Sequence, residues 1–310
     1  LISHTPGRHF ASSPGVSVRF LPALIVTALV AALGACQKKP PPVPAPPAIL
    51  PYEIGDAYLY LLGRALVLRE QRRDFEQGAQ WNQLVHRKPG DREGESPQPD
   101  VLVSEAWIVV DEQHCVALEI PKITDRYCTW HVLNGWGETL ININERTHPE
   151  HPSGKFALCL KGSAATAPED ALRIDLPVNI ARAIARVQVG ADMRSAQRLQ
   201  QQFKLAGDAG IEIPPAVDFP LFDDDKLPGV ELFDRAADIL GGEPDLNPGM
   251  ESIRAKAEEI AALARASDTE RERIRSAIEK EGWPTLKELL NTPGPTSNGW
   301  SHPAVAGHYG

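Results

Sequence analysis

The sequence predicts an α+β fold, in which an antiparallel β-rich domain with a sandwich or barrel-like arrangement is flanked by helices. Two observations lead to this prediction. Between residues 100 and 190, apolar and polar residues alternate in short segments, which is the period of strands with one buried face. On either side of this region, apolar residues recur at spacings of three and four, which is the period of an amphipathic helix. The hydrophobic content of 42% and the charged content of 24% are typical of a globular protein.

The N-terminal segment predicts a lipoprotein signal peptide over residues 1–35. Residues 20–35 carry no charge and follow Arg19. This apolar run is shorter than the ~20 residues of a membrane span but has the length of a secretory h-region. The sequence LGAC at residues 33–36 resembles the lipobox of bacterial lipoproteins, which implies cleavage before Cys36 and acylation of that residue. An uncleaved N-terminal anchor helix and a chance cysteine are the alternatives.

Residues 36–51 predict a linker between the lipid anchor and the folded part. The sequence PPPVPAPPAILP at residues 40–51 favours polyproline II, which acts as a semi-rigid spacer. Gln37 stands where enteric bacteria place an acidic residue to retain lipoproteins in the inner membrane, so the outer membrane, facing the periplasm, is favoured over the inner one. The expected partner is a lipid bilayer, contacted through acylated Cys36.

The first folded segment predicts a helix, and the region after it predicts strands. In the segment from Tyr52 to Arg73, small or apolar residues recur on one face at Ala57, Leu61, Ala65 and Leu68. Alternation is clearest at residues 115–120, where Val116, Leu118 and Ile120 share one face. Short connections predict antiparallel pairing. Five segments are expected to be strands: residues 100–112, 115–121, 126–134, 138–145 and 155–162.

The C-terminal third predicts a proline-containing loop and then charged helices that form a solvated outer layer. Residues 211–229 contain prolines that forbid regular structure. In the following helix we expect Asn247 to cap and Pro248 to occupy the first turn. One face of this helix is lined by Ile253, Ala257, Ile260 and Ala264.

A second charged helix is expected from Ser267 to Gly282. Ser267 and Glu270 have the spacing of a capping box, and Gly282 can end the helix. The predicted organisation has five parts: a signal peptide at 1–35, a lipidated and proline-rich linker at 36–51, a β-rich domain at 52–206, a loop and helical extension at 207–290, and the start of a further, truncated domain at 291–310.

Charge and motifs exclude several classes of function. The net charge is −9, and it becomes −11 after removal of residues 1–35, which contain two arginines and no acid. Because a protein that binds the phosphate backbone needs a basic face, we do not expect nucleic acid as a partner. The sequence has no Gly-rich phosphate loop, G-x-S-x-G, His-Glu-x-x-His or Ser-x-x-Lys motif, and we expect no cofactor.

Three cysteines follow the linker, at positions 115, 128 and 159. This odd number predicts at most one disulfide plus a buried thiol, with the pairing left open. Together with His114 and His131, Cys115 and Cys128 could form a zinc site. Strand alternation argues against this metal site, because it places Cys128 and His131 on opposite faces.

Two polar segments have a structural interpretation as well as a functional one. The sequence THPEHPSG, with His148 and His151, could bring two imidazoles together, but its prolines favour a turn between strands. The acidic run at residues 223–225 lacks the glycine and distal glutamate of a calcium loop, which favours a solvated acidic loop.

A series of weak motifs resembles the bacterial family called domain of unknown function 1254 (DUF1254). The resemblance covers residues 55–206, continues more loosely to residue 242, and is followed at residues 298–310 by what resembles the opening of a DUF1214 domain. Its motifs are GDAYLYLLGRALVLREQRR, WNQLVHRK, PQPDVLVSEAWIVVD, ALEIPKITDRYCTWHVLNGWGETLININER, GKFALCLKG, IARAIARVQVG and RLQQQFKL.

The resemblance implies a set of candidate ligand-binding residues. The chain departs from the family at residues 97–103, where it keeps an aspartate and loses an amide, a hydroxyl and a phenol. Arginines beside a sheet can hold a carboxylate or phosphate bidentately, and an aspartate could orient them or act as a general base. The alternative is a turn between strands with ion pairs at the sheet rim. The candidates are Asp100, Asp125, Arg126, Tyr127, Arg146 and Arg186.

Two functions follow from these observations. The first is an envelope lipoprotein that binds or processes a small anionic or carbohydrate-like ligand. The second is a non-catalytic envelope structural or assembly protein, indicated by the predicted anchor and spacer together with the lack of a catalytic motif.

Overall fold

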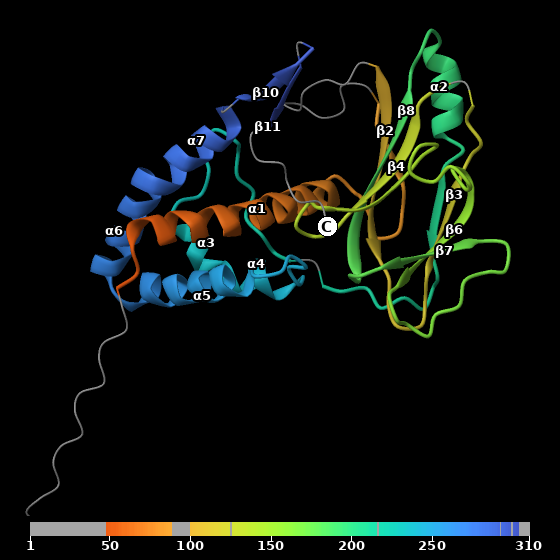
Figure 1. The fold of residues 1–310 in the computed structure, drawn as a ribbon. Coiled ribbons are helices and arrows are strands. Elements are labelled where there is room, and N and C mark those ends of the chain that lie inside the picture. Colours follow the sequence, from red (N-terminus) through yellow and green to blue (C-terminus); the bar gives the residue numbers. More distant parts are fainter. Residues whose placement is uncertain are drawn as a thin grey trace, which may run out of the picture. The chain divides into compact units, whose positions relative to one another are not determined.

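The computed structural model describes residues 48–88, 100–124, 126–215, 217–291, 293–298 and 300–303. The predicted signal peptide, Cys36 and most of the linker lie outside these residues. Residues Ile49–Gly310 form one unit (Figure 1), whose described part contains two hydrophobic cores. No helix in the described part of the chain is long and apolar enough to cross a membrane.

The β-rich part is a sandwich of two open sheets, so the predicted α+β class is confirmed and the barrel-like alternative is not adopted. The first sheet has the order β1(Val85–His86), β2(Val101–Val109), β8(Ile180–Gln188), β4(Cys128–Leu133), β5(Thr139–Ile143). The second has the order β7(Leu172–Leu176), β6(Gly154–Leu160), β3(Val116–Ile120), β9(Lys204–Gly207). Helix α2(Met193–Gln200) connects β8 to β9.

The inner faces of the two sheets share one core, as the alternation of apolar residues predicts. Val116, Leu118 and Ile120 of β3 are buried in it. Trp130 and Val132 of β4 pack against them from the other sheet. All five predicted strand segments contain strands, and the structure adds β1, β7, β8 and β9 to the two sheets. The expected antiparallel pairing holds with one correction, because β6 and β7 run parallel.

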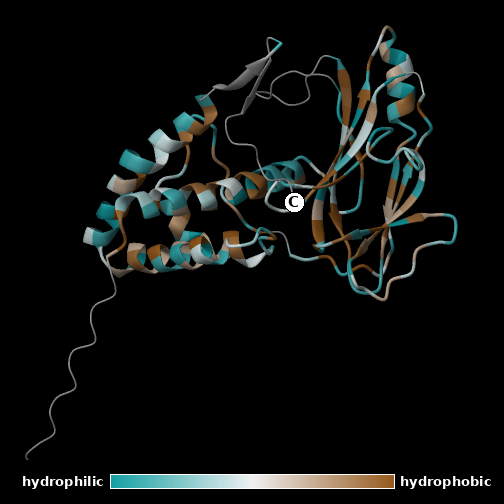
Figure 2. Ribbon diagram, in the orientation of Figure 1, coloured by the Kyte–Doolittle hydropathy of each residue, from teal (hydrophilic) through white to brown (hydrophobic). Residues whose placement is uncertain are grey.

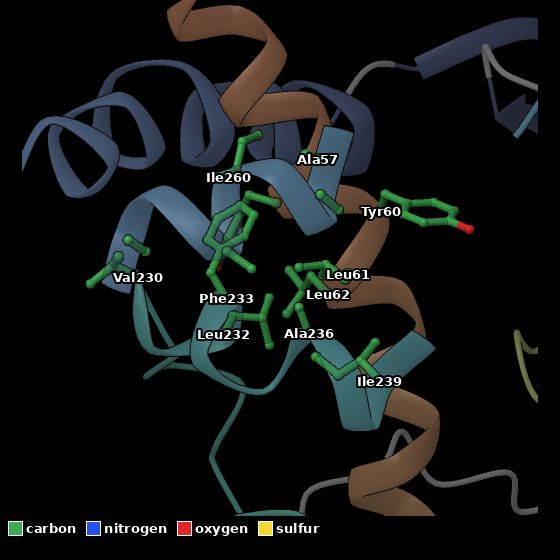
Figure 3. Packing of buried hydrophobic residues seen from close by; sticks show 14 of the residues in the cluster. Ala57, Tyr60, Leu61, Leu62, Val230, Leu232, Phe233, Ala236, Ile239 and Ile260 are labelled. Carbon is green, nitrogen blue, oxygen red and sulfur yellow. The ribbon is translucent and has the colours of Figure 1, made fainter. Parts of the chain in front are cut away.

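The second core is helical and is built around α1(Pro51–Glu76). Figure 3 shows Leu61 of this helix among Leu232, Phe233 and Ile239. The predicted apolar face of α1 is confirmed, because Ala57, Leu61, Ala65 and Leu68 are all buried. Its partners are α3(Glu231–Asp234), α4(Ala236–Gly241), α5(Glu251–Ala266), α6(Asp268–Ala277), η1(Ile278–Gly282) and α7(Trp283–Asn291). A hairpin of β10(Pro293–Ser297) and β11(Trp300–Pro303) follows.

The C-terminal helices therefore form a core with α1 and are more than a solvated layer, although polar residues dominate the surface of α6 (Figure 2). The Ser267 cap is confirmed, since its Oγ accepts a hydrogen bond from the Glu270 amide at 3.2 Å. Two predicted boundaries are wrong. Helix α5 begins at Glu251, so Asn247 and Pro248 lie in the turn before it. Gly282 does not end the helix, which continues through the π-helical turn η1 into α7.

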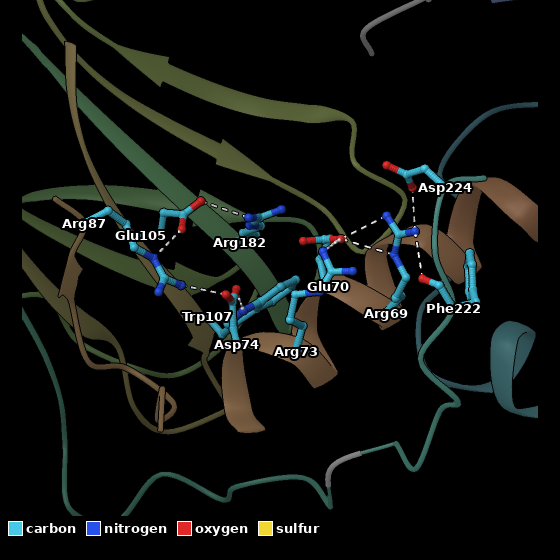
Figure 4. Close-up of polar contacts among 10 residues, drawn as sticks. All are labelled: Arg69, Glu70, Arg73, Asp74, Arg87, Glu105, Trp107, Arg182, Phe222 and Asp224. Atoms are coloured by element: carbon cyan, nitrogen blue, oxygen red, sulfur yellow. Dashed lines mark hydrogen bonds and ion pairs between the residues drawn. The ribbon is translucent and has the colours of Figure 1, made fainter. Parts of the chain in front are cut away.

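Buried ionic contacts connect the last turn of α1 to the first sheet (Figure 4). Asp74 accepts hydrogen bonds from Arg87 Nη2 at 2.6 Å and from Trp107 Nε1 at 2.9 Å. Glu105 of β2 in turn accepts from Arg87 Nε at 3.0 Å and from Arg182 Nη2 of β8 at 2.9 Å. Because Asp74 is 2% exposed and Glu105 is 7% exposed, these carboxylates depend on their partners for charge compensation.

Candidate functional site

Three of the predicted site residues, Arg126, Tyr127 and Arg146, meet at a surface hollow of about 410 Å³. We call it the β4–β5 hollow. Lys122 adds a third cation to its lining. The lining residues are Pro121, Lys122, Ile123, Thr124, Arg126, Tyr127, Cys128, Asn144, Glu145, Arg146, Pro152 and Ser153.

The hollow lies at the open end of the hairpin formed by β4 and β5. Tyr127 precedes β4 directly, and Arg146 follows β5 by three residues. The Gln188 amide of β8 donates to the Tyr127 carbonyl at 2.9 Å, which continues the β4–β8 pairing to this point. The side-chain oxygen of Asn144 accepts from the Arg146 amide at 2.8 Å and fixes the turn after β5. Antiparallel pairing thus brings together residues that are nineteen positions apart.

The hollow is positively charged on an acidic protein. Lys122 and Arg146 are exposed, and neither side chain has a hydrogen-bond or ion-pair partner among the described residues. The Arg146 guanidinium lies over the Tyr127 ring, 5.9 Å from its centroid. Arg126 is held in place, because its Nη1 donates to the Val189 carbonyl at 3.1 Å. The described lining includes a single carboxylate, that of Glu145, so the charges favour an anion.

Cys128 also lines the hollow, but its thiol is not prepared for chemistry. Burial, together with the charge of Glu145, raises the pKa of this thiol to about 12. A thiol with such a pKa stays protonated at neutral pH, and the thiolate is the nucleophilic form. We therefore assign Cys128 a packing role beside the core residues that its strand contributes.

The other three predicted residues do not join this hollow. Asp125 lies outside the described residues. The Asp100 carbonyl accepts from the Val189 amide at 2.7 Å, while its side chain is not part of the lining. Arg186 stands on the face of the first sheet that points away from the sandwich core, paired across the strands with Val103 and Thr129.

Arg186 nevertheless shapes a polar strip on that face. Its positive charge, after the larger effect of burial, lowers the pKa of His131 on the neighbouring strand. The Arg186 side chain has no hydrogen-bond or ion-pair partner within the described part of the chain. Thr129, next to Arg186, donates to the Asn142 side chain, which also accepts from Asn144 at 3.2 Å. This strip extends to the hollow through Asn144, which lines it.

Sequence reasoning missed Lys122, Asn144 and Ser153 as lining residues. Lys122 and Asn144 lie inside the motif ALEIPKITDRYCTWHVLNGWGETLININER, but nothing in their spacing separates a lining residue from an ordinary surface residue. The strand alternation alone could have placed Asn144 on the same face as Asn142. The loop that contributes Ser153 needed the tertiary structure.

The remaining motifs have structural roles. Cys115 forms a disulfide with Cys159, which confirms one disulfide plus a further thiol and removes Cys115 as a zinc ligand. The described residues contain no cluster of three potential metal ligands. The segment with His148 and His151 forms a turn, in which the His151 amide donates to the His148 carbonyl at 3.0 Å. In the acidic loop, Asp224 accepts from Arg69 Nη1 at 2.6 Å.

Comparison with known proteins supports the resemblance found in the sequence. Residues 81–207 match the family described as "Protein of unknown function (DUF1254)". This match spans the chain from the start of the sandwich to its last strand, β9, and includes the whole hollow. A search of curated proteins gives no match.

Similarity to solved structures extends over most of the chain. Among the similar structures is that of the VPA0106 protein from Vibrio parahaemolyticus, with a TM-score of 0.54 and 17% sequence identity, and the alignment covers 77% of this chain and 59% of that protein. The chain thus spans about three fifths of that relative's length. At this identity the similarity shows a shared fold.

Proposed function

We propose that this protein is a membrane-anchored envelope lipoprotein that binds a small anion, a carboxylate or a phosphate, in the β4–β5 hollow. The observation that carries the proposal is the convergence of Lys122, Arg126 and Arg146 on one cavity in a chain of net charge −9. Two of these cations lack a protein partner among the described residues, so an anion would supply charge compensation that the protein does not.

The shape and chemistry of the hollow support a small ligand. Its volume of about 410 Å³ is within the range of small-molecule sites, roughly 300–1,000 Å³. A guanidinium offers two parallel N–H groups that match a carboxylate or phosphate, and an ammonium adds a point charge. Ser153 and Asn144 can hydrogen-bond polar groups on the rest of the ligand. These lining residues can recognise an anion, but they do not indicate a chemical reaction of the bound ligand.

The envelope location is supported by two features. The lipobox at residues 33–36 predicts acylation of Cys36. The Cys115–Cys159 disulfide suits an oxidising compartment such as the periplasm, because thiols in the cytosol are kept reduced. Metabolic labelling with a palmitate analogue tests the anchor. We expect incorporation into the wild-type chain and none into Cys36→Ser.

Anion binding is tested by isothermal titration calorimetry of the wild type with inorganic phosphate and with citrate at low ionic strength. We expect Lys122→Gln and Arg146→Gln each to weaken binding by about tenfold, since a hydrogen bond to a charged group contributes roughly 1.5 kcal/mol. Lys280→Gln is the matched control, because Lys280 is an exposed cation in η1, outside the hollow.

The controls separate specific binding from general charge effects. If Lys280→Gln weakened phosphate or citrate binding as much as Arg146→Gln, binding would depend on the overall charge of the protein and not on the hollow. If neither anion bound the wild type at millimolar concentration, the anion proposal would fail. The structural or assembly role in the envelope would then be the better interpretation of the lipobox and the linker.

A further inference from the structure

Unpartnered polar groups concentrate at one buried place away from the hollow. Among the described residues, nine buried side-chain nitrogen and oxygen atoms have no hydrogen-bond partner, and five of these atoms belong to Tyr60, Arg64, Trp136 and Glu243. The Glu243 side chain contributes both carboxyl oxygens, and the residue is 2% exposed. Arg64 is 4% exposed. Leaving buried polar atoms without partners costs free energy, so such a concentration calls for a physical explanation.

Three segments meet at this cluster, which we call the Glu243 cluster. Helix α1 contributes Tyr60 and Arg64, and the segment after α4 contributes Glu243. The turn between β4 and β5 contributes Gly135 and Trp136, and the Trp136 ring stacks on Tyr60 with centroids 4.7 Å apart. The cluster is therefore a contact between the helical core and the sandwich.

Gly135 shows how closely these groups approach. A Cβ at this position would lie 2.6 Å from Glu243 Cγ and 2.8 Å from Arg64 Nη1. The Arg64 Nη1 group donates its hydrogen bond to the Gly135 carbonyl and not to Glu243. No Arg64 nitrogen lies within 4.0 Å of a Glu243 oxygen, so the carboxyl is close to a positive charge and yet is not in an ion pair with it.

The protonation state of Glu243 follows from these contacts. Burial raises the pKa of this carboxyl to about 7, and the opposing effects of Arg64 and of the Ile180 amide in β8 are smaller. That amide lies near the carboxyl without satisfying the geometry of a hydrogen bond. The other charged groups around the cluster are Glu138 in the turn, Asp245 after Glu243, and Arg254 in α5, which surround Tyr60.

We propose that Glu243 is a proton-binding site that controls how firmly the β4–β5 turn is held against α1. With the proton bound, the carboxyl is neutral and the Glu243 cluster stays closed. When the proton leaves, an unpaired carboxylate is buried, and the cluster relieves this by opening to water. The proposal does not depend on anion binding in the hollow, which lies at the other end of the same hairpin.

The direction of the pH effect is fixed by the raised pKa. The carboxyl has a pKa of about 7 in the closed state, against 4.5 for a glutamate in water. The closed state therefore has its full stability below pH 4.5, loses stability as the pH rises towards 7, and changes little above that. By this linkage the open population should rise about 27-fold between pH 5.5 and pH 8.

Hydrogen exchange at the turn measures this opening. The Asn134 amide donates to the Glu138 carbonyl at 2.9 Å, and the Gly137 amide donates to the Asn134 carbonyl at 3.0 Å. After correction for intrinsic exchange rates, we expect their protection factors in the wild type to fall about 27-fold between pH 5.5 and pH 8. Glu243→Gln keeps a neutral side chain at every pH and should show no such fall. Glu112→Gln, an exposed residue, should behave like the wild type.

Two results would overturn the proposal. The first is a fall in protection that is the same in Glu243→Gln as in the wild type. The second comes from wild-type protein alone and covers the case in which the variant does not fold. A carbon-13 NMR titration should give Glu243 an apparent pKa between 6 and 8, and a value near 4.5 would show that the carboxyl is not buried as a neutral group.

Discussion

The Cys115–Cys159 disulfide connects two neighbouring strands of the second sheet. Cys115 comes directly before β3, Cys159 lies in β6, and these strands pair from Val116 with Leu158 onward. The two residues are 44 positions apart, so the disulfide restricts a long loop of the unfolded chain. On the chain-entropy account such a loop contributes about 4 kcal/mol to the free energy of unfolding.

We therefore expect Cys115→Ala/Cys159→Ala to unfold at a lower urea concentration, with a loss of about 2–4 kcal/mol. Addition of dithiothreitol should destabilise the wild type and leave the double variant unchanged, which isolates the disulfide from the effect of the substitutions. Equal sensitivity of both proteins to the reductant would show that the disulfide does not form.

For single residues, the sequence predicted the sheet face of some side chains but not which distant residues would lie beside them. Strand alternation was enough to put Cys128 and His131 on opposite faces, because the period of two is a local property. It could not show that Arg186 would stand on β8, the strand next to β4, and outside the lining of the hollow, since that depends on β8 lying between β2 and β4. The cluster around Glu243 has no local signature, because its members come from three distant segments.

Two helical elements cross closely at a pair of glycines. A Cβ at Gly55 of α1 would lie 3.0 Å from Glu281 Cβ and 3.1 Å from the Gly282 nitrogen. A Cβ at Gly282 would lie 3.0 Å from the Tyr58 ring. The sequence suggested Gly282 as a helix end, because glycine commonly follows a helix. The structure instead uses its missing side chain to let η1 approach α1.

This crossing predicts opposite effects for two substitutions in the same helix. Gly55→Ala should lower the free energy of unfolding by about 1 kcal/mol, since overpacking against backbone exceeds the gain in helix propensity. Gly63→Ala should raise it by about 0.5–1 kcal/mol, because Gly63 is exposed and a Cβ there meets nothing within 4 Å. Urea denaturation of both variants measures the difference. A stabilising Gly55→Ala would show that the crossing is looser than the structure indicates.

In the whole molecule, α1 belongs to the helical core and is also tied to the first sheet by its last turn. Its apolar face between Ile54 and Leu68 is buried among the C-terminal helices, and its last turn presents Asp74 to the first sheet. A single helix that is fixed at both places makes the two cores unfold together. We therefore expect the wild type to show one cooperative unfolding transition when its far-ultraviolet circular dichroism and its tryptophan fluorescence are compared.

Asp74→Ala should break this connection. The substitution removes the carboxylate that accepts from Arg87 Nη2 and from the Trp107 indole nitrogen, so that Arg87 keeps only its contact with Glu105, and loss of one member of a buried ion pair costs about 3 kcal/mol. Because α1 would then be fixed mainly in the helical core, the two cores should unfold separately. The transitions followed by far-ultraviolet circular dichroism and by tryptophan fluorescence should then occur at different urea concentrations. Asp56→Ala, an exposed residue at the other end of α1, should change stability by less than about 0.5 kcal/mol and keep the transitions coincident. Coincident transitions in Asp74→Ala would mean that contacts elsewhere, such as the Glu243 cluster, are sufficient to couple the two cores.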